Sequence, residues 1–281
     1  MDLNLKERIA WVTGASGGIG RAIASELGSE GVHLALQAHS NASELRSWVS
    51  EQPFGAKALV LEADVRSPEE LDRCAERILE AFGRIDICIP CAGIWPTEDL
   101  SLDEMPPERL ANTLAVNLAG ALFTARSFLG ALRRTGPHPD GEGASIAFIG
   151  STAARFGERD HADYAASKAG LVGAMRSLKN EIVRLDPFGR VNVLEPGWTV
   201  THMARPALQE PGVVERVVRT MALRQLARAT DIARVVAVLA SPYASSHVTG
   251  QVVTVAGGME GRLLWGEQEI DRPGILARLE R

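Results

Sequence analysis

Cysteine is scarce in this chain of 281 residues, which contains only Cys74, Cys88 and Cys91. Three cysteines so close together are too few for a disulfide framework of the kind that holds small secreted domains. Cys88 and Cys91 have the spacing of a redox dithiol, but they follow a strand-like run at 84–87. Residues three apart on a strand point to opposite faces of the sheet, so we predict buried structural cysteines.

Long apolar runs and blocks of positive charge are also missing. No stretch approaches the roughly 18–20 apolar residues that span a bilayer, and the N-terminus lacks the basic-then-apolar pattern of a signal peptide. The chain has 30 Lys and Arg against 35 Asp and Glu, a net charge of −5, with no basic block. We therefore expect neither nucleic acid nor a membrane as partner, and we expect a cytoplasmic location.

The composition is that of an ordinary globular protein, with 46% hydrophobic and 23% charged residues. A chain of this length can bury a large core without disulfides or metals. No linker rich in Pro, Gly or Ser divides it, and no internal repeat is visible. The sequence therefore predicts one domain.

Short β-branched runs alternate with apolar stripes at helical spacing, such as Leu71, Ala75, Ile78 and Phe82. This alternation predicts right-handed βαβ units. The fold class is therefore α/β, a doubly wound domain with a seven-stranded, mainly parallel sheet flanked by helices. The expected strands are 8–13, 32–37, 58–62, 85–89, 143–149, 190–194 and 251–255.

A glycine-rich segment, 13–20, joins the first expected strand to the first helix. Glycine allows a tight turn in which a pyrophosphate can approach backbone N–H groups at the positive end of a helix. Glycine is also the default turn residue, but the place of this turn between strand and helix favours dinucleotide binding. The expected contacts are Gly14, Ser16, Gly17, Gly18, Ile19 and Gly20.

The end of the second strand bears on which dinucleotide is bound. An acidic residue there would bind the ribose hydroxyls of NAD(H) and repel the 2′-phosphate of NADP(H). This chain has His39, Ser40 and Asn41 instead, with no carboxylate. NADP(H) is therefore favoured, and NAD(H) stays open because no Lys or Arg lies in 37–41. Asn41 with Glu44 also fits a helix capping box.

Tyr164 and Lys168 stand four residues apart, on one face of an expected helix. A free phenol has a pKa of about 10, and a neighbouring cation favours the phenolate, which brings the pKa closer to neutral pH. Ser151 follows the fifth expected strand, at the carboxyl edge where open α/β sheets bind ligands. Alone, Ser151 would be interpreted as a helix cap or a turn residue. With the glycine-rich loop, the three residues predict a site that reduces carbonyl groups.

These motifs resemble those of the short-chain dehydrogenase/reductase family, whose single domain has the Rossmann fold. The resemblance is strongest to members similar to 3-oxoacyl-(acyl carrier protein) reductases, and it extends over 8–259. We therefore expect a domain at 1–259 and a C-terminal extension at 260–281. The motifs that carry the resemblance are the glycine-rich loop 13–20, Asp64 with Val65, Asn117, Ser151, Tyr164 with Lys168, and 196–201.

The resemblance implies a role for each matching residue. Tyr164 would protonate the carbonyl oxygen and Ser151 would polarise and orient it. Lys168 would lower the pKa of Tyr164 and bind the nicotinamide ribose, while Asn117 would hold a water that links Lys168 to solvent. The other implied nucleotide contacts are Asp64, Val65, Ala92, Gly93, Pro196, Gly197, Thr199 and Thr201.

The chain departs from the family in two places. Where the family usually has Asn-Asn-Ala-Gly, this chain has Pro90-Cys91-Ala92-Gly93. Pro90 lacks the backbone N–H that a central strand uses, so we expect a local irregularity there. The second departure is the extension, which contains an expected short amphipathic helix around Ile275. We expect its Trp265 either to pack on a neighbouring subunit or to lie on a flexible tail.

The resemblance also suggests a substrate site and an assembly. The segment 198–226 resembles the family's substrate lid, although its apolar content also fits helices packed on the sheet. Helices near 107–132 and 162–185 resemble the pair through which family members form dimers and tetramers. No metal is expected, because the histidines lack metal-ligand spacing. The weaker substrate-pocket candidates are Trp95, Ala153, Phe156 and Trp198.

The sequence therefore predicts an NADP(H)-dependent oxidoreductase. It would transfer a hydride between nicotinamide and a small-molecule carbonyl or secondary alcohol, such as a 3-oxoacyl thioester or another ketone. An NAD-dependent alcohol dehydrogenase and a non-catalytic nucleotide sensor are the alternatives. The complete catalytic set argues against a sensor, because sensing does not require it.

Overall fold

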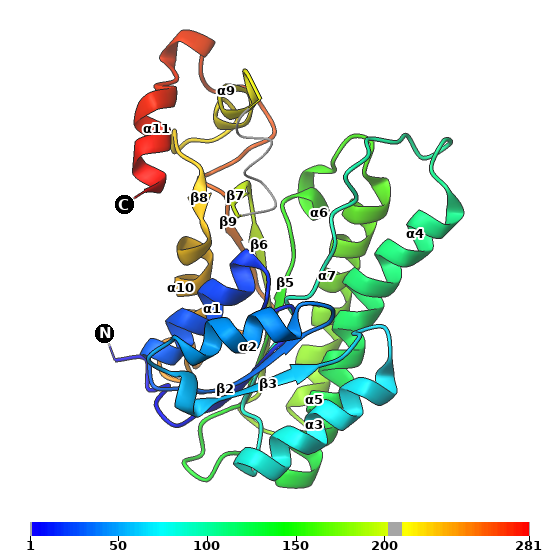
Figure 1. Cartoon of the computed structure of the whole chain (residues 1–281), viewed down its shortest axis with the longest axis vertical. Coiled ribbons are helices and arrows are strands. Elements are labelled where there is room, and N and C mark those ends of the chain that lie inside the picture. Colours follow the sequence, from blue (N-terminus) through cyan, green and yellow to red (C-terminus); the bar gives the residue numbers. More distant parts are fainter. Residues whose placement is uncertain (1, 202–209, 281) are drawn as a thin grey trace.

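The computed structural model describes residues 2–201 and 210–280, and its main feature is a seven-stranded sheet. All neighbouring strands are parallel, in the order β3-β2-β1-β4-β5-β6-β9 (Figure 1). The seven predicted strands are confirmed. Their bounds are β1 (Ile9–Val12), β2 (His33–Ala38), β3 (Ala58–Glu62), β4 (Ile87–Ile89), β5 (Ser145–Ile149), β6 (Arg190–Pro196) and β9 (Val252–Val255).

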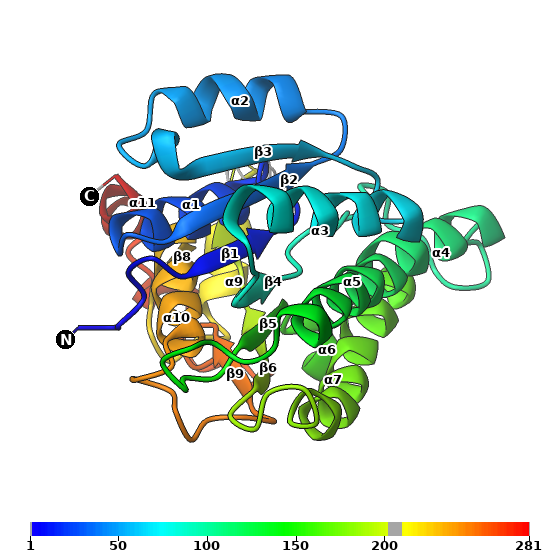
Figure 2. The same ribbon diagram turned by 90° about the horizontal axis from the view of Figure 1, so that it is seen from below.

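Helices cover both faces of the sheet, as a doubly wound fold requires (Figure 2). One face packs against α1 (Gly18–Ser29), α2 (Ala42–Ser50) and α10 (Ala229–Ala240). The other face packs against α3 (Pro68–Phe82), α5 (Gly120–Thr135) and α7 (Ala162–Ile182). The strand order reverses between β1 and β4, and ligands of such sheets bind outside the carboxyl ends of the strands at that point.

Pro90 ends β4 after three residues, and the expected irregularity is present. The two residues after it use a side chain in place of a strand partner, because the hydroxyl of Thr13 accepts hydrogen bonds from the N–H groups of Cys91 (3.2 Å) and Ala92 (3.3 Å). Cys88 packs in the core beneath α3, α5 and α7, whereas Cys91 packs toward the α1 side. The two cysteines therefore lie on opposite faces, as predicted.

A helical run from Pro107 to Thr135 is long and apolar enough to cross a membrane by length and composition alone, so the expectation that no stretch reaches that length was wrong. The run comprises α4 (Pro107–Leu114), a π-helical turn η2 (Ala115–Ala119) and α5. In this fold α5 packs against α3 and α7, with Phe128 and Leu132 fully buried. Its apolar character is therefore that of a core helix.

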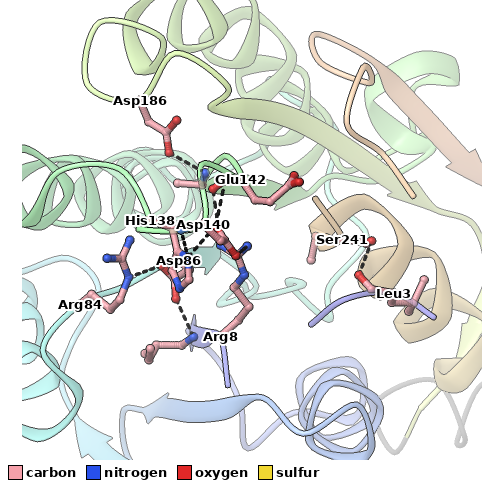
Figure 3. Close-up of polar contacts among 12 residues, drawn as sticks. Leu3, Arg8, Arg84, Asp86, His138, Asp140, Glu142, Asp186 and Ser241 are labelled. Atoms are coloured by element: carbon pink, nitrogen blue, oxygen red, sulfur yellow. Dashed lines mark hydrogen bonds and ion pairs between the residues drawn. The ribbon is translucent and has the colours of Figure 1, made fainter. Parts of the chain in front are cut away.

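The amino ends of the strands are held by polar contacts (Figure 3). The Asp86 carboxylate accepts a hydrogen bond from the N–H of Ile9 (2.9 Å) and pairs with Arg84 (2.6 Å). Asp186 accepts a hydrogen bond from the N–H of Ala144 (2.8 Å). The first carboxylate joins the starts of β1 and β4, and the second joins the start of β5 to the turn before β6, so this edge of the sheet is held on the side away from the carboxyl ends.

A smaller core lies between the predicted lid and the C-terminal extension. It contains four buried valines of α9 (Val213–Val218) and Ile275 of α11 (Arg272–Leu279), and Trp198 packs against it. Residues 202–209 of the predicted lid lie outside the described residues. Two short strands, β7 (Thr199–Val200) and β8 (Ala227–Arg228), form a separate sheet that the sequence did not predict. Figure 1 shows α9 and α11 near each other beyond β7 and β8.

Candidate active site

At three glycines of the glycine-rich loop, a side chain would not fit. Gly14 has φ +65°, and a Cβ on it would lie 2.6 Å from the Cα of Ala92. A Cβ on Gly20 would lie 2.4 Å from the Gly14 carbonyl oxygen, and one on Gly18 would lie 2.9 Å from the Cβ of Thr201. The loop thus brings residues 14–20, Ala92 and Thr201 together, as the expected nucleotide contacts require.

The helix that follows this loop begins without a side-chain cap. Gly17 is the N-cap residue of this helix, and no acidic residue lies in the first turn of the helix. The N–H groups of that turn therefore face no carboxylate of their own helix, and they and the helix dipole suit a phosphate group. This cradle fits the pyrophosphate of a dinucleotide.

A buried glutamine that sequence reasoning missed supports the same loop. The Oε1 of Gln37 accepts a hydrogen bond from the N–H of Gly14 (3.2 Å), and its Nε2 donates to the carbonyl of Ala63. The Gln37 carbonyl also accepts a hydrogen bond from Ala15 (2.9 Å). A polar residue inside an otherwise apolar strand, 33–38, was the signal that could have identified it.

At the adenosine end, His39 is 63% exposed and its Nε2 lies 3.8 Å from Asp64. Arg66 binds both carboxylate oxygens of Asp64 at 2.6–3.0 Å and holds the pKa of that carboxyl below its ordinary value. Val65 packs beside Gly120, because a Cβ on Gly120 would lie 2.7 Å from a methyl group of Val65. Asp64, one of the expected nucleotide contacts, is thus already paired with an arginine.

The predicted capping box at the start of α2 does not form. Asn41 is the N-cap residue, but its side chain makes no cap hydrogen bond. Glu44 pairs instead with Arg21, whose Nε donates to the carbonyl of Ser16 (3.1 Å). Arg21 therefore links the glycine-rich loop to α2 and provides a cation that the residues 37–41 lack. Its place in the helix sequence gave no hint of this contact.

Lys168 is buried below Tyr164 on α7. Its Nζ donates a hydrogen bond to the carbonyl of Ile149 (3.0 Å) at the end of β5 and lies 5.8 Å from the centre of the Tyr164 ring. Burial lowers the pKa of Lys168 to about 8. Burial also raises the pKa of Tyr164, and a hydrogen bond from Ser151 opposes that rise. The lowering of the Tyr164 pKa by Lys168 stays a prediction.

Asn117 lies on the π-helical turn, a feature often found at functional sites. Its side-chain amide donates to the carbonyl of Ile94 (3.0 Å) and accepts from the N–H of the same residue (2.8 Å). A Cβ on Gly93 would lie 3.3 Å from the Asn117 Oδ1 and 3.4 Å from the Lys168 Nζ. Gly93, Asn117 and Lys168 therefore meet at one point.

Ser151 combines the two interpretations that its sequence position allows. Its Oγ accepts a hydrogen bond from the N–H of Ala153 (3.2 Å) at the start of α6 (Ala153–Phe156), so it acts as a turn residue. Its hydroxyl also opposes the rise that burial causes in the pKa of Tyr164, as expected of a hydroxyl that faces the phenol. The Ser151 hydroxyl can therefore accept the turn hydrogen bond and still donate its own proton toward a substrate.

Two aromatic rings continue the site from Tyr164. Trp95 meets Tyr164 edge to face, with ring centres 4.7 Å apart, and stacks on His161 at 4.0 Å. His161 is buried, and its Nε2 lies 2.9 Å from the carbonyl oxygen of Pro96. Trp95 is therefore held in a fixed orientation beside the phenol. Sequence reasoning proposed Trp95 for the substrate pocket, and the structure adds His161 as the ring that stacks on it.

The other three candidates for the substrate pocket are Ala153, Phe156 and Trp198. Ala153 is buried, Phe156 is 42% exposed, and Trp198 packs on the small core beneath α9. Trp198 follows Pro196 and Gly197, where a Cβ on the glycine would lie 2.6 Å from the Cβ of Ala256. The Thr199 hydroxyl donates to the Gly197 carbonyl (3.0 Å).

A buried carboxylate near the site was not predicted. The Glu195 side chain is 3% exposed, its Oε2 accepts a hydrogen bond from Thr254 (3.3 Å), and the Nε of Arg155 on α6 lies 3.5 Å from it. A Cβ on Gly150 would lie 3.3 Å from its Cγ. The pair therefore adjoins the residue just before Ser151. Within 2–201 and 210–280, no group of three or more acidic, Cys or His side chains could hold a metal ion.

The chain belongs to the short-chain dehydrogenase/reductase family, whose members are oxidoreductases that act on CH–OH or C=O groups with NAD(P). Residues 14–260 match the family described as enoyl-(acyl carrier protein) reductase. The chain is therefore an enzyme of this class, and the predicted family and fold are confirmed.

Among known proteins, the chain is 33% identical to an L-rhamnose 1-dehydrogenase (NAD(P)(+)) of Azotobacter vinelandii, over 91% of this chain and 97% of that protein. It is also 33% identical to the 3-oxoacyl-(acyl carrier protein) reductase FabG of Escherichia coli, over 92% and 99%. Its fold is similar to that of a glucose/ribitol dehydrogenase-type member of the family from Brucella melitensis, with a TM-score of 0.83 and 30% identity over 92% and 99%.

Proposed function

We propose that this enzyme is an NADP(H)-dependent reductase of ketones, with the reverse oxidation of secondary alcohols at the same site. The observation that carries the proposal is the meeting of Ser151, Tyr164 and Lys168 beyond the end of β5, next to the glycine-rich cradle. The bound nicotinamide would supply a hydride to the carbonyl carbon or accept one from the alcohol.

Each side chain would act on the proton side of this reaction. Tyr164 would donate its proton to the carbonyl oxygen as negative charge develops there, and Ser151 would donate a hydrogen bond to the same oxygen. Lys168, with a pKa of about 8, is largely protonated at neutral pH and would stabilise the phenolate left behind. Asn117 would position a water through which Lys168 exchanges protons with solvent.

The preference for NADP(H) is supported by the charges at the adenosine end. The charge of Asp64 is neutralised by Arg66. Arg21 contacts both the Ser16 carbonyl and Glu44, and Glu44 follows Ser40 and Asn41 by only a few residues. A 2′-phosphate would compete with Glu44 for the Arg21 guanidinium. The remaining nucleotide contacts proposed are Gly14, Gly17, Gly18, Ile19, Gly20, Val65, Ala92, Gly93, Pro196, Gly197, Thr199 and Thr201.

Oxidation of a polyol or sugar with NAD is the second candidate. Two observations favour it: the polar Arg155–Glu195 pair beside the substrate side of Ser151, and the names of the rhamnose and glucose/ribitol dehydrogenases that resemble this chain. A 3-oxoacyl thioester would instead use the apolar surface of Trp95, Phe156 and Trp198. The two candidates differ in cofactor and in direction.

Titration of the protein with NADPH and with NADH, followed by nucleotide fluorescence, tests the cofactor proposal first. We expect tighter binding of NADPH, and a loss of about tenfold in NADPH affinity for Arg21→Ala with NADH affinity unchanged, since a charge-assisted hydrogen bond is worth ~1.5 kcal/mol. Arg73→Ala, at an exposed arginine of α3, is the matched control. Tighter binding of NADH would favour the second candidate.

The catalytic proposal is tested with Tyr164→Phe. Removal of the hydroxyl should abolish turnover with a panel of ketones while the nucleotide affinity stays within twofold. Near-normal turnover in this variant would refute the role of Tyr164.

A homodimer or homotetramer in the cytoplasm is the proposed state. A groove of about 420 Å³ on the outer side of α5 and α7 supports it, because Leu122, Leu129 and Leu178 line the groove. Arg126, Arg133 and Glu181 at the same groove provide charges for a symmetric contact. Light scattering of the purified protein measures the assembly.

A further inference from the structure

We propose that the C-terminal extension is a specificity element of the substrate site: residues 260–280 fix the position of α9 and of Trp198 and contact Phe156 on the opposite side. This inference rests on the proposed function for the meaning of "substrate", but the anchoring itself is argued and tested without it.

The chain turns back onto the predicted lid directly after β9. Gly257, Gly258 and Gly261 all have positive φ, of +60°, +76° and +73°, which other residues rarely adopt. The Gly257 carbonyl accepts a hydrogen bond from the N–H of Leu223 (2.8 Å). These glycines direct the extension along residues 219–223 and not away from the domain.

Backbone hydrogen bonds continue this pairing. The N–H of Glu260 donates to the carbonyl of Thr220 (3.3 Å), and the N–H of Leu264 donates to the carbonyl of Arg219 (2.7 Å). Main-chain pairing of this kind holds a segment along its length, independently of side-chain identity. The extension is therefore attached to the segment that follows α9.

Trp265 is the main anchor. Its indole N–H donates to the carbonyl of Met221 (2.6 Å), and its own carbonyl accepts from the Nε of Arg219 (3.0 Å). The Arg224 guanidinium lies 4.1 Å from the ring centre, within the range of a cation–π interaction. Met221 and Arg224 thus contact the Trp265 side chain, and Arg219 contacts its backbone carbonyl.

α9 depends on the extension for its core. A helix of six residues is far too short to be stable alone. Its valines are buried together with Ile275 of α11, and Arg272 pairs with Glu215 at 3.5 Å. Arg224 also donates to the carbonyl of Glu269 (3.1 Å). Without α11, this small core would lose one of its sides.

The same extension reaches the substrate side of the catalytic residues. A Cβ on Gly261 would lie 3.3 Å from the ring of Phe156, which stands five residues after Ser151. Trp198, on the other side, packs on the core that Ile275 completes. The extension therefore joins two of the proposed pocket residues, and the space between them should limit the size of the group attached to the carbonyl.

Trp265→Ala tests the inference, with Trp265→Phe as the conservative variant and Leu263→Ala as the control, since Leu263 is 63% exposed on the same segment. Hydrogen exchange of residues 213–226, nucleotide affinity, and kcat and KM for ketones of increasing size are compared. For Trp265→Ala we expect exchange at least tenfold faster in 213–226 and nucleotide affinity within twofold. We expect KM to rise at least fivefold for the ketones that wild type prefers, with kcat for a small ketone changed less than twofold.

Trp265→Phe should recover part of both effects, because the ring stays over Arg224 while the N–H is lost. Unchanged exchange in 213–226 would overturn the anchoring, and unchanged KM across the series would overturn the role in specificity. Exchange is read without substrate, so failure of the wild type to reduce any ketone would count against the proposed function and leave the anchoring result standing.

Discussion

The buried charge of Lys168 should lower the free energy of unfolding of the protein at neutral pH. Lys168 is buried, and its pKa of about 8 compares with an ordinary value of 10.5. That difference corresponds to about 3 kcal/mol against the folded state at neutral pH, where the side chain is charged both folded and unfolded.

We therefore predict that Lys168→Met stabilises the protein at pH 7. The methionine removes the buried charge but leaves the Ile149 carbonyl without its donor, which costs ~1–2 kcal/mol. The net gain should be about 1–2 kcal/mol, measured as the free energy of unfolding in urea. Turnover should be lost in the same variant.

The pH dependence of the stability difference between Lys168→Met and the wild type is a more specific test than its value at pH 7. Between pH 8 and 10.5 the unfolded chain binds a proton at Lys168 that the folded chain has released, so the stability of the wild type rises with pH in this window. The advantage of Lys168→Met should therefore be largest below pH 8 and shrink above it. Lys6→Met, at an exposed lysine, is the control. A variant that is less stable at pH 7, or whose advantage does not change with pH, would refute the reasoning.

Three further outcomes follow from the structure. Gly14→Ala should weaken nucleotide binding at least tenfold in a fluorescence titration, because its Cβ would meet the Ala92 backbone at 2.6 Å in a left-handed conformation. Asp163→Asn should lower the free energy of unfolding by about 3 kcal/mol in urea, because it leaves the largely buried Arg109 without its ion pair; a loss below 1 kcal/mol would contradict this. The thiols of Cys74 and Cys91, whose pKa values burial raises to about 11, should react with a disulfide reagent at pH 7.5 only after unfolding, as absorbance of the released thiolate would show.

The sheet was predictable because its signal is local. Each strand is a short β-branched run, and the alternation with helical stripes fixes a parallel arrangement within narrow limits. The break at Pro90 was predictable for the same reason, since a proline removes one donor wherever it stands. The substitute partner, the hydroxyl of Thr13, was not predictable, because 78 residues separate it from Cys91.

The contacts that sequence reasoning missed are those between surfaces distant in the chain. Glu44 fits a capping box by its spacing from Asn41, yet it is drawn to Arg21 on another helix. The indole N–H of Trp265 in the extension donates to the Met221 carbonyl, 44 residues upstream. Periodicity reveals which face of an element is apolar, but not which other element will cover it.

The small core between α9 and α11 also bears on how the protein is made. The chain leaves the ribosome from its N-terminus, and domains fold as they emerge. The last of the proposed catalytic side chains, Lys168, is synthesised more than a hundred residues before Ile275, which completes the core under α9. A nascent chain can therefore assemble the nucleotide cradle first, and the wall beside Phe156 is the last part to form.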